Sequence, residues 1–155
     1  MIENLQWTGV ENYSFHLIQA MKKHSLNEGE RVFLYSPSKL NDDLADMPTG
    51  WESKVLNWPI SSMWMQGRVS WEVYKTQPSV LFLPSQGPVR YKGNTKIVST
   101  IHDIGFITYK AFYQSSDIKR LKSATKRAIK KSDELISVSN FTKQELVDLL
   151  KINPE

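Results

Sequence analysis

Apolar residues along this chain alternate between helical spacing and short continuous runs. The spacing of Tyr13, Leu17 and Met21 predicts an amphipathic helix over residues 11–24. Continuous apolar runs that end at Pro, Gly or polar residues predict strands. By this criterion the expected strands are 31–36, 54–58, 80–83, 96–101 and 135–138.

Three further helices complete the expected pattern. Residues 61–76 place several aromatic side chains near one face, and residues 117–131 separate an apolar face from a Lys/Arg face. After the last strand, we expect Thr142 to cap a helix in a capping box with Glu145. The alternation of helices and strands predicts an α/β fold, a Rossmann-like three-layer parallel sheet with helices on both faces.

The start of the chain departs from the usual order of such a sheet. A doubly wound domain opens with a central strand, followed by a glycine turn and a helix. This chain opens at the glycine turn, with Gly9 just before the first helix, so we expect the first strand to be lacking. A length of 155 residues suits one domain, and we expect residues 1–155 to form it.

The composition indicates an ordinary globular protein with 40% hydrophobic and 23% charged residues. The chain has no cysteine, which excludes disulfides and cysteine-based metal sites and is compatible with a reducing cytoplasm. No apolar stretch reaches the ~20 residues of a membrane span, and the first residues lack a signal-peptide pattern. We therefore expect a cytoplasmic protein, with the inner face of the membrane as a peripheral location.

Positive charge is concentrated on the helix at residues 117–131. From Asp117 to Asp133 there are seven Lys/Arg against two Asp, within a net charge of +4 for the chain. Such a patch can meet phosphate groups, or it can be a solvated helix face. Nucleic acid ranks last as a partner, because the helix has no interleaved aromatics and no known reading motif. The candidate membrane-docking residues are Lys119, Lys122, Lys126 and Lys130.

Polar residues follow two of the predicted strands. His102 and Asp103 come after strand 96–101, and Ser139 and Asn140 come after the last strand. The carboxyl ends of parallel strands meet at one edge, where ligands bind in open α/β sheets. A histidine there can donate a hydrogen bond or move a proton, although a histidine packed in a loop is the plain alternative. Ser139 and Asn140 can contact a ligand or belong to the cap of the next helix.

Gly9 is a further candidate binding residue, and the absence of three known motifs narrows the possible functions. A glycine before a helix lets the backbone approach a phosphate, although it can also be a simple turn. The chain has no Gly-x-Ser-x-Gly elbow, no phosphate-binding loop of NTPases and no Gly-x-Gly-x-x-Gly fingerprint. These absences argue against a serine hydrolase, a P-loop NTPase and ordinary dinucleotide binding. Metal binding by His102 is not supported, because His16 and His24 lie on the first helix without ligand spacing.

Three stretches of the chain carry a family resemblance. They are WTGVENYSFHLIQAM at 7–21, TIHDIGF at 100–106 and RAIKKSDELISVSNFTKQEL at 127–146. In this order and at these separations, they resemble the amino-terminal domain of retaining GT-B glycosyltransferases of the group 1, or family 4, type. The resemblance covers nearly the whole chain.

The resemblance implies the acceptor-side domain of an enzyme that moves a sugar from a nucleotide-sugar to a polysaccharide or glycolipid, with retention. It implies no cofactor and no metal, since the nucleotide-sugar is the donor substrate. By position, Gly9 would present its backbone N–H to the donor diphosphate. His102 would be catalytic through a hydrogen bond at the transferred sugar, and Asp103, Ser139 and Asn140 would line the cleft.

The carboxyl-terminal domain of the family, which holds most nucleotide-sugar contacts, is not found in these 155 residues. We therefore expect a form truncated at both ends that does not transfer sugar alone. The alternative is a non-catalytic binding module, or a truncated gene product, that docks to membrane or a partner through its basic helix. Acceptor choice would lie in the loops at 37–53 and 84–95.

Overall fold

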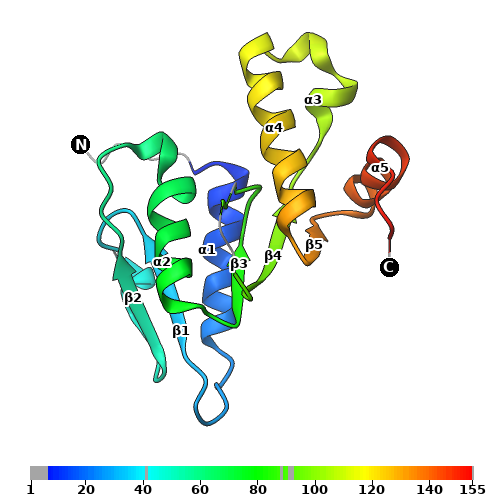
Figure 1. Cartoon of the computed structure of the whole chain (residues 1–155). Coiled ribbons are helices and arrows are strands. Elements are labelled where there is room, and N and C mark those ends of the chain that lie inside the picture. Colours follow the sequence, from blue (N-terminus) through cyan, green and yellow to red (C-terminus); the bar gives the residue numbers. More distant parts are fainter. Residues whose placement is uncertain (1–6, 41, 88, 91–92, 155) are drawn as a thin grey trace, which may run out of the picture. The chain divides into compact units, whose positions relative to one another are not determined.

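The computed structural model describes residues 7–40, 42–87, 89–90 and 93–154 (Figure 1). The chain divides into two compact units, Met1–Trp64 and Met65–Glu155. Each unit is described below by itself. The start of the chain, where we expect the first strand to be lacking, falls largely on residues 1–6, which lie outside the described residues.

The first unit is a helix with a two-stranded parallel sheet. Its elements are α1 (Gly9–Lys22), β1 (Val32–Ser36), η1 (Asp42–Leu44), β2 (Trp51–Val55) and η2 (Ser61–Met63). Strands β1 and β2 pair in register from Val32 opposite Trp51 to Ser36 opposite Val55.

Helix α1 begins two residues earlier than the apolar spacing predicts. Thr8 is its N-cap and forms a capping box with Glu11, in which each side chain accepts a hydrogen bond from the other residue's backbone N–H. This arrangement satisfies two of the backbone donors that every helix start leaves without a partner inside the helix. The box therefore fixes the start at Gly9.

The segment at 37–53 is fastened to α1. The ammonium group of Lys22 donates to the backbone carbonyls of Asp43, Leu44 and Asp46. Gln19, one turn earlier on the helix, donates to the Asp43 carbonyl. A segment expected to be a plain loop therefore has a short helix, η1, whose carbonyls are held by a cation.

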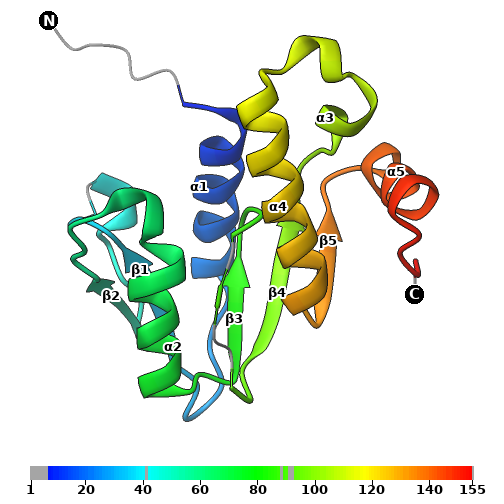
Figure 2. The same cartoon turned by 45° about the horizontal axis from the view of Figure 1, so that its top comes forward.

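The second unit has a three-stranded parallel sheet in the order β3-β4-β5 (Figure 2). Its register places Leu81 opposite Ile97 and Ile101 opposite Ser137. The elements are η3 (Met65–Val69), α2 (Ser70–Thr76), β3 (Val80–Leu83), β4 (Lys96–Ile101), α3 (Gly105–Thr108), η4 (Lys110–Phe112), α4 (Ser115–Lys131), β5 (Glu134–Ser137) and α5 (Asn140–Leu150).

A hydrophobic core joins the strands and helices of this unit. Helix α4 packs on β4, and α5 packs on β5. The middle strand β4 is largely buried on both faces, as strands inside parallel sheets usually are. The cluster at the carboxyl end of β4 consists of Ile101, Ile104, Phe106, Ala128 and Leu146.

The α/β fold class is confirmed, and three details of it are corrected. The expected single sheet is present as two separate parallel sheets. Strand β2 starts at Trp51 rather than at residue 54, because Gly50 adopts a positive φ of 84° and closes a turn immediately before it. The single helix expected at 61–76 is divided into η2, η3 and α2.

The division of that helix has a local cause. Residues Met65–Val69 form a wider π-helical turn, and the Ser70 hydroxyl donates to the Met65 carbonyl at 3.0 Å. The same hydroxyl accepts a hydrogen bond from the backbone N–H of Arg90 at 3.0 Å. A serine bonded in this way competes with regular helical hydrogen bonds, so the apolar spacing alone overestimates the length of α2.

Candidate functional site

His102 follows β4 directly and lies half-buried at the carboxyl end of the sheet. Its Nε2 atom is 2.8 Å from the backbone carbonyl oxygen of Pro84, which follows β3. A carbonyl oxygen only accepts hydrogen bonds, so Nε2 carries the proton and donates it. The Nε2–H group of His102 therefore joins the end of β4 to the loop after β3.

Asp103 is exposed, and both its carboxylate and its backbone are engaged. Its Oδ1 accepts a hydrogen bond from the backbone N–H of Gly105 at 3.1 Å, at the start of α3. Its carbonyl accepts from Nε2 of Gln86 at 3.0 Å, and Oε1 of Gln86 accepts from the Thr125 hydroxyl at 3.4 Å. Gln86 therefore joins the loop after β3, the loop after β4 and helix α4.

Ser139 is the N-cap of α5, which corrects the expectation that Thr142 caps this helix. The Ser139 hydroxyl accepts from the backbone N–H of Thr142 at 3.1 Å. The buried Thr142 hydroxyl instead donates to the backbone carbonyl of His102 at 3.1 Å. Glu145 is not part of a capping box, because its carboxylate accepts from the Thr108 hydroxyl at 3.3 Å. Asn140 is the exposed first residue of α5.

Four predicted site residues are thus placed on one edge of the β3-β4-β5 sheet. They are His102, Asp103, Ser139 and Asn140. The sequence pattern did not single out Pro84 or Gln86, although it did place a loop at the end of the preceding strand. Their contacts with His102 and Asp103 join residues 17 and 18 positions apart, which no local spacing reveals.

Gly9 belongs to the other compact unit and is described on its own. It is the exposed first residue of α1, and a Cβ added to it would meet no atom within 4 Å. Two hydrogen bonds with Thr8 lower the pKa of the Glu11 carboxyl below its ordinary value. The bond with the Thr8 backbone has the larger effect, and the bond with the Thr8 side chain has the smaller one. The Glu11 carboxylate is therefore charged at neutral pH. It adds negative charge at the amino-terminal end of α1, where the family resemblance implies that the donor diphosphate binds.

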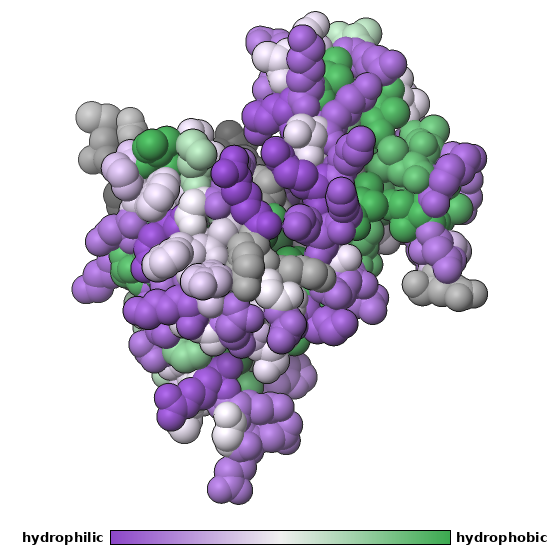
Figure 3. Space-filling view, viewed as in Figure 1, coloured by the Kyte–Doolittle hydropathy of each residue, from purple (hydrophilic) through white to green (hydrophobic). Residues whose placement is uncertain are grey.

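The four lysines named above lie on one face of α4. Lys119, Lys122, Lys126 and Lys130 are spaced by three or four residues, which aligns them along a helix. All four are exposed, and within the described residues none has an ion-pair partner. Figure 3 shows the surface over α4 as largely hydrophilic. The only carboxylate within α4, Asp117, pairs with Arg120 at 3.2 Å.

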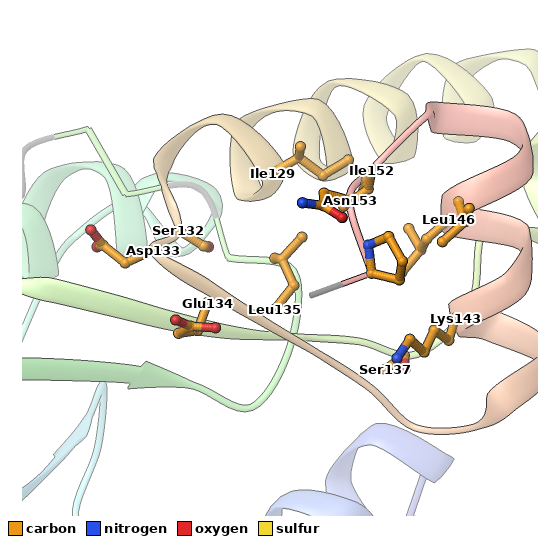
Figure 4. A pocket seen from close by; sticks show the side chains of 12 residues that line it. Ile129, Ser132, Asp133, Glu134, Leu135, Ser137, Lys143, Leu146, Ile152 and Asn153 are labelled. Carbon is orange, nitrogen blue, oxygen red and sulfur yellow. The ribbon is translucent and has the colours of Figure 1, made fainter.

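A hollow of about 400 Å³ lies elsewhere in the second unit, among the end of α4, β5, α5 and residues 152–154 (Figure 4). Asp133, Lys143 and Asn153 are among its polar lining, and His102 is not part of it. The carboxylate of Asp133 already accepts the backbone N–H of Ile97 at 2.8 Å. Glu134 also lines the hollow, and its side chain is exposed. None of the residues that the sequence predicts for the site lies in this lining, so the strand edge at His102 is the better candidate site.

The described residues contain no helix long and apolar enough to cross a membrane. They also contain no group of three side chains of the kinds that hold a metal ion.

The second unit is an α/β unit with polar side chains at the edge where its parallel strands end. Residues 7–155 match the sequence profile described as Glycosyltransferase Family 4. The chain therefore belongs to this family, as an amino-terminal domain of the GT-B type. No significant match was found among curated proteins or among solved structures.

Proposed function

We propose that this domain is the acceptor side of an enzyme that moves a sugar from a nucleotide-sugar to a polysaccharide or glycolipid acceptor. The observation that carries the proposal is the N–H donor of His102 at the carboxyl end of β4, in a chain of glycosyltransferase family 4. A nucleotide-sugar-binding domain would complete the site. Members of this family act on sugars in general. The nucleotide-sugar donor and the polysaccharide or glycolipid acceptor are the more specific part of our proposal.

The proposed step retains the configuration of the sugar. The bond between the anomeric carbon and the donor phosphate breaks, and the acceptor oxygen bonds to the same face of that carbon. The acceptor proton passes to the leaving phosphate oxygen. In this step, the Nε2–H group of His102 leaves the Pro84 carbonyl and donates its hydrogen bond to an oxygen of the sugar instead.

The supporting groups at the edge have positioning roles. The hydroxyl of Thr142 holds the carbonyl of His102, and Gln86 holds the carbonyl of Asp103. Both contacts fix the backbone that carries the histidine ring, which keeps its donor aimed in one direction. Ser139 and Asn140 line the cleft in this proposal, and Gly9 offers its backbone N–H to the donor diphosphate.

The proposal is tested by NMR on the isotope-labelled chain, titrated with UDP-glucose and GDP-mannose at millimolar concentration. We expect chemical-shift changes at the His102 ring and at the backbone of Asp103 and Ser139, and their loss in His102→Ala. The matched control is His16→Ala, which removes an exposed histidine from α1. Changes confined to Ile152 and Asn153, or no changes at all, would contradict the proposal.

A second candidate function is a non-catalytic module that docks to a membrane or partner through α4. The lysines of that helix, which lack ion-pair partners among the described residues, favour it. The two candidates differ in their use of His102. Sugar binding requires its ring, whereas docking through α4 is expected to be unchanged in His102→Ala.

A further inference from the structure

Phe112 is the most exposed large hydrophobic side chain in the described part of the chain, at 86%. It ends the short helix η4, beside the half-exposed ring of Tyr109. The segment is held in place, because Phe112 N–H donates to the Tyr109 carbonyl at 3.0 Å and Tyr113 packs against the core cluster. The fold therefore holds the backbone that carries this exposed aromatic ring.

Lysines lie close to Phe112 in the sequence, both before it and at the start of α4. Lys110 is exposed beside Phe112, and α4 begins three residues after Phe112, at Ser115. Lys119 and Lys122 lie in the first two turns of that helix. Figures 1 and 2 both place the segment between α3 and α4 at the amino-terminal end of α4. We call Tyr109, Lys110, Phe112, Lys119 and Lys122 the aromatic tip.

We propose that the aromatic tip inserts shallowly into the surface of an anionic lipid bilayer. Single exposed apolar residues are common on proteins, so the ring alone would carry no weight. An aromatic ring flanked by lysines, however, matches the boundary between lipid headgroups and acyl chains. The ring enters the apolar layer, while the lysine stems lie along it and keep their ammonium groups among the phosphates.

The charges of α4 support a bilayer as the partner. Lys119 and Lys122, three positions apart near the start of α4, repel each other, and an anionic surface relieves that repulsion. This inference specifies the partner of the docking function proposed above. It does not depend on sugar transfer, and failure of either leaves the other testable.

An insertion led by Phe112 predicts a gradient along the helix. At a rise of about 1.5 Å per residue, Lys130 lies about 16 Å further along α4 than Lys119. The attraction of a lysine to the membrane falls off over a Debye length of about 10 Å. Lys119 should therefore contribute much more than Lys130, whereas a helix lying flat on the membrane would use both equally.

The first experiment measures binding of the full chain to phosphatidylcholine vesicles with and without phosphatidylglycerol. We expect binding only with the anionic lipid, about tenfold weaker for Phe112→Ser and about fivefold weaker or more for Lys119→Glu. Lys130→Glu should have a smaller effect than Lys119→Glu. The matched control is Trp71→Ser, because Trp71 is another exposed aromatic, at 59%, in the same unit.

Three results would overturn the proposal. They are no binding of the unchanged chain to anionic vesicles, equal weakening by Trp71→Ser and Phe112→Ser, and equal effects of Lys119→Glu and Lys130→Glu. Circular dichroism of each variant checks that the fold is retained.

A second experiment leaves every residue of the tip in place. The chain has no cysteine, so Ala111→Cys creates a single labelling position beside Phe112. A polarity-sensitive dye at this position should shift to the blue with anionic vesicles, and a dye at Lys75→Cys, at the end of α2, should not. A blue shift at position 75 alone, or at neither position, would show that the tip does not enter the bilayer.

Discussion

At the scale of single residues, Thr95 and Thr125 form an informative pair. Both are buried at 2% exposure. The Thr125 hydroxyl donates to Oε1 of Gln86, whereas the Thr95 hydroxyl has no hydrogen-bond partner among the described residues. A buried polar group without a partner lowers stability, because folding removes its hydrogen bonds to water without replacing them.

We therefore predict opposite effects for the same substitution at the two positions. Thr95→Val keeps the side-chain shape and should raise the free energy of unfolding by about 1 kcal/mol. Thr125→Val leaves the Gln86 oxygen without its donor and should lower it by about 1–2 kcal/mol. Chemical denaturation of both variants measures the difference. A loss of stability in Thr95→Val would mean that the Thr95 hydroxyl has a hydrogen-bond partner, and a gain in Thr125→Val would mean that the bond to Gln86 does not stabilise the fold.

At the scale of one element, helix α5 depends on its cap. The Ser139 hydroxyl accepts the backbone N–H of Thr142, so Ser139→Ala should lower the free energy of unfolding by about 1 kcal/mol. Asn140→Ala is the matched control, because Asn140 is exposed and follows the cap. Denaturant unfolding monitored by circular dichroism compares the two. If both variants matched the unchanged chain, Ser139 would have no structural role in α5.

Elements differ in how far the sequence predicts them. The bounds of β3 and β4 agree with those expected, because each strand has apolar residues on both of its faces. Strand β2 and the helix expected at 61–76 do not agree, because a glycine turn and the hydrogen bonds of Ser70 set those boundaries. Hydrophobic spacing carries no information about either.

The candidate site, too, was predicted from the sequence only in part. Strand order was sufficient to place His102 and Ser139 on one edge of a sheet. The direction of the His102 ring was not predictable, because it depends on a carbonyl at Pro84 in a different loop. Such contacts arise from folded geometry, so only the structure gives the donor state of the ring.

At the scale of the whole molecule, the buried apolar side chains are divided unevenly. The first unit buries Trp51 and Leu56, and α1 has no fully buried residue. The second unit holds the other buried hydrophobic residues of the described chain, with Ile97 and Ile101 in β4 nearly inaccessible. Local opening requires less free energy where fewer apolar contacts are broken.

We predict that the first unit opens before the second. Backbone amides in β1 should exchange with deuterium at least tenfold faster than those in β4, because β4 has a partner strand on both sides. Native-state hydrogen exchange by NMR measures both strands in one sample. Equal protection in the two strands would show that the units unfold together.

The hydrogen bonds between Lys22 and the segment after β1 affect which substitutions this segment can tolerate. The lysine contacts the main-chain carbonyls of Asp43, Leu44 and Asp46, and it contacts none of their side chains through these bonds. Every amino acid has such a carbonyl, so mutations at these three positions leave the attachment intact. Evolution, or a designer, can therefore vary the side chains that this loop presents while its backbone stays fastened to α1.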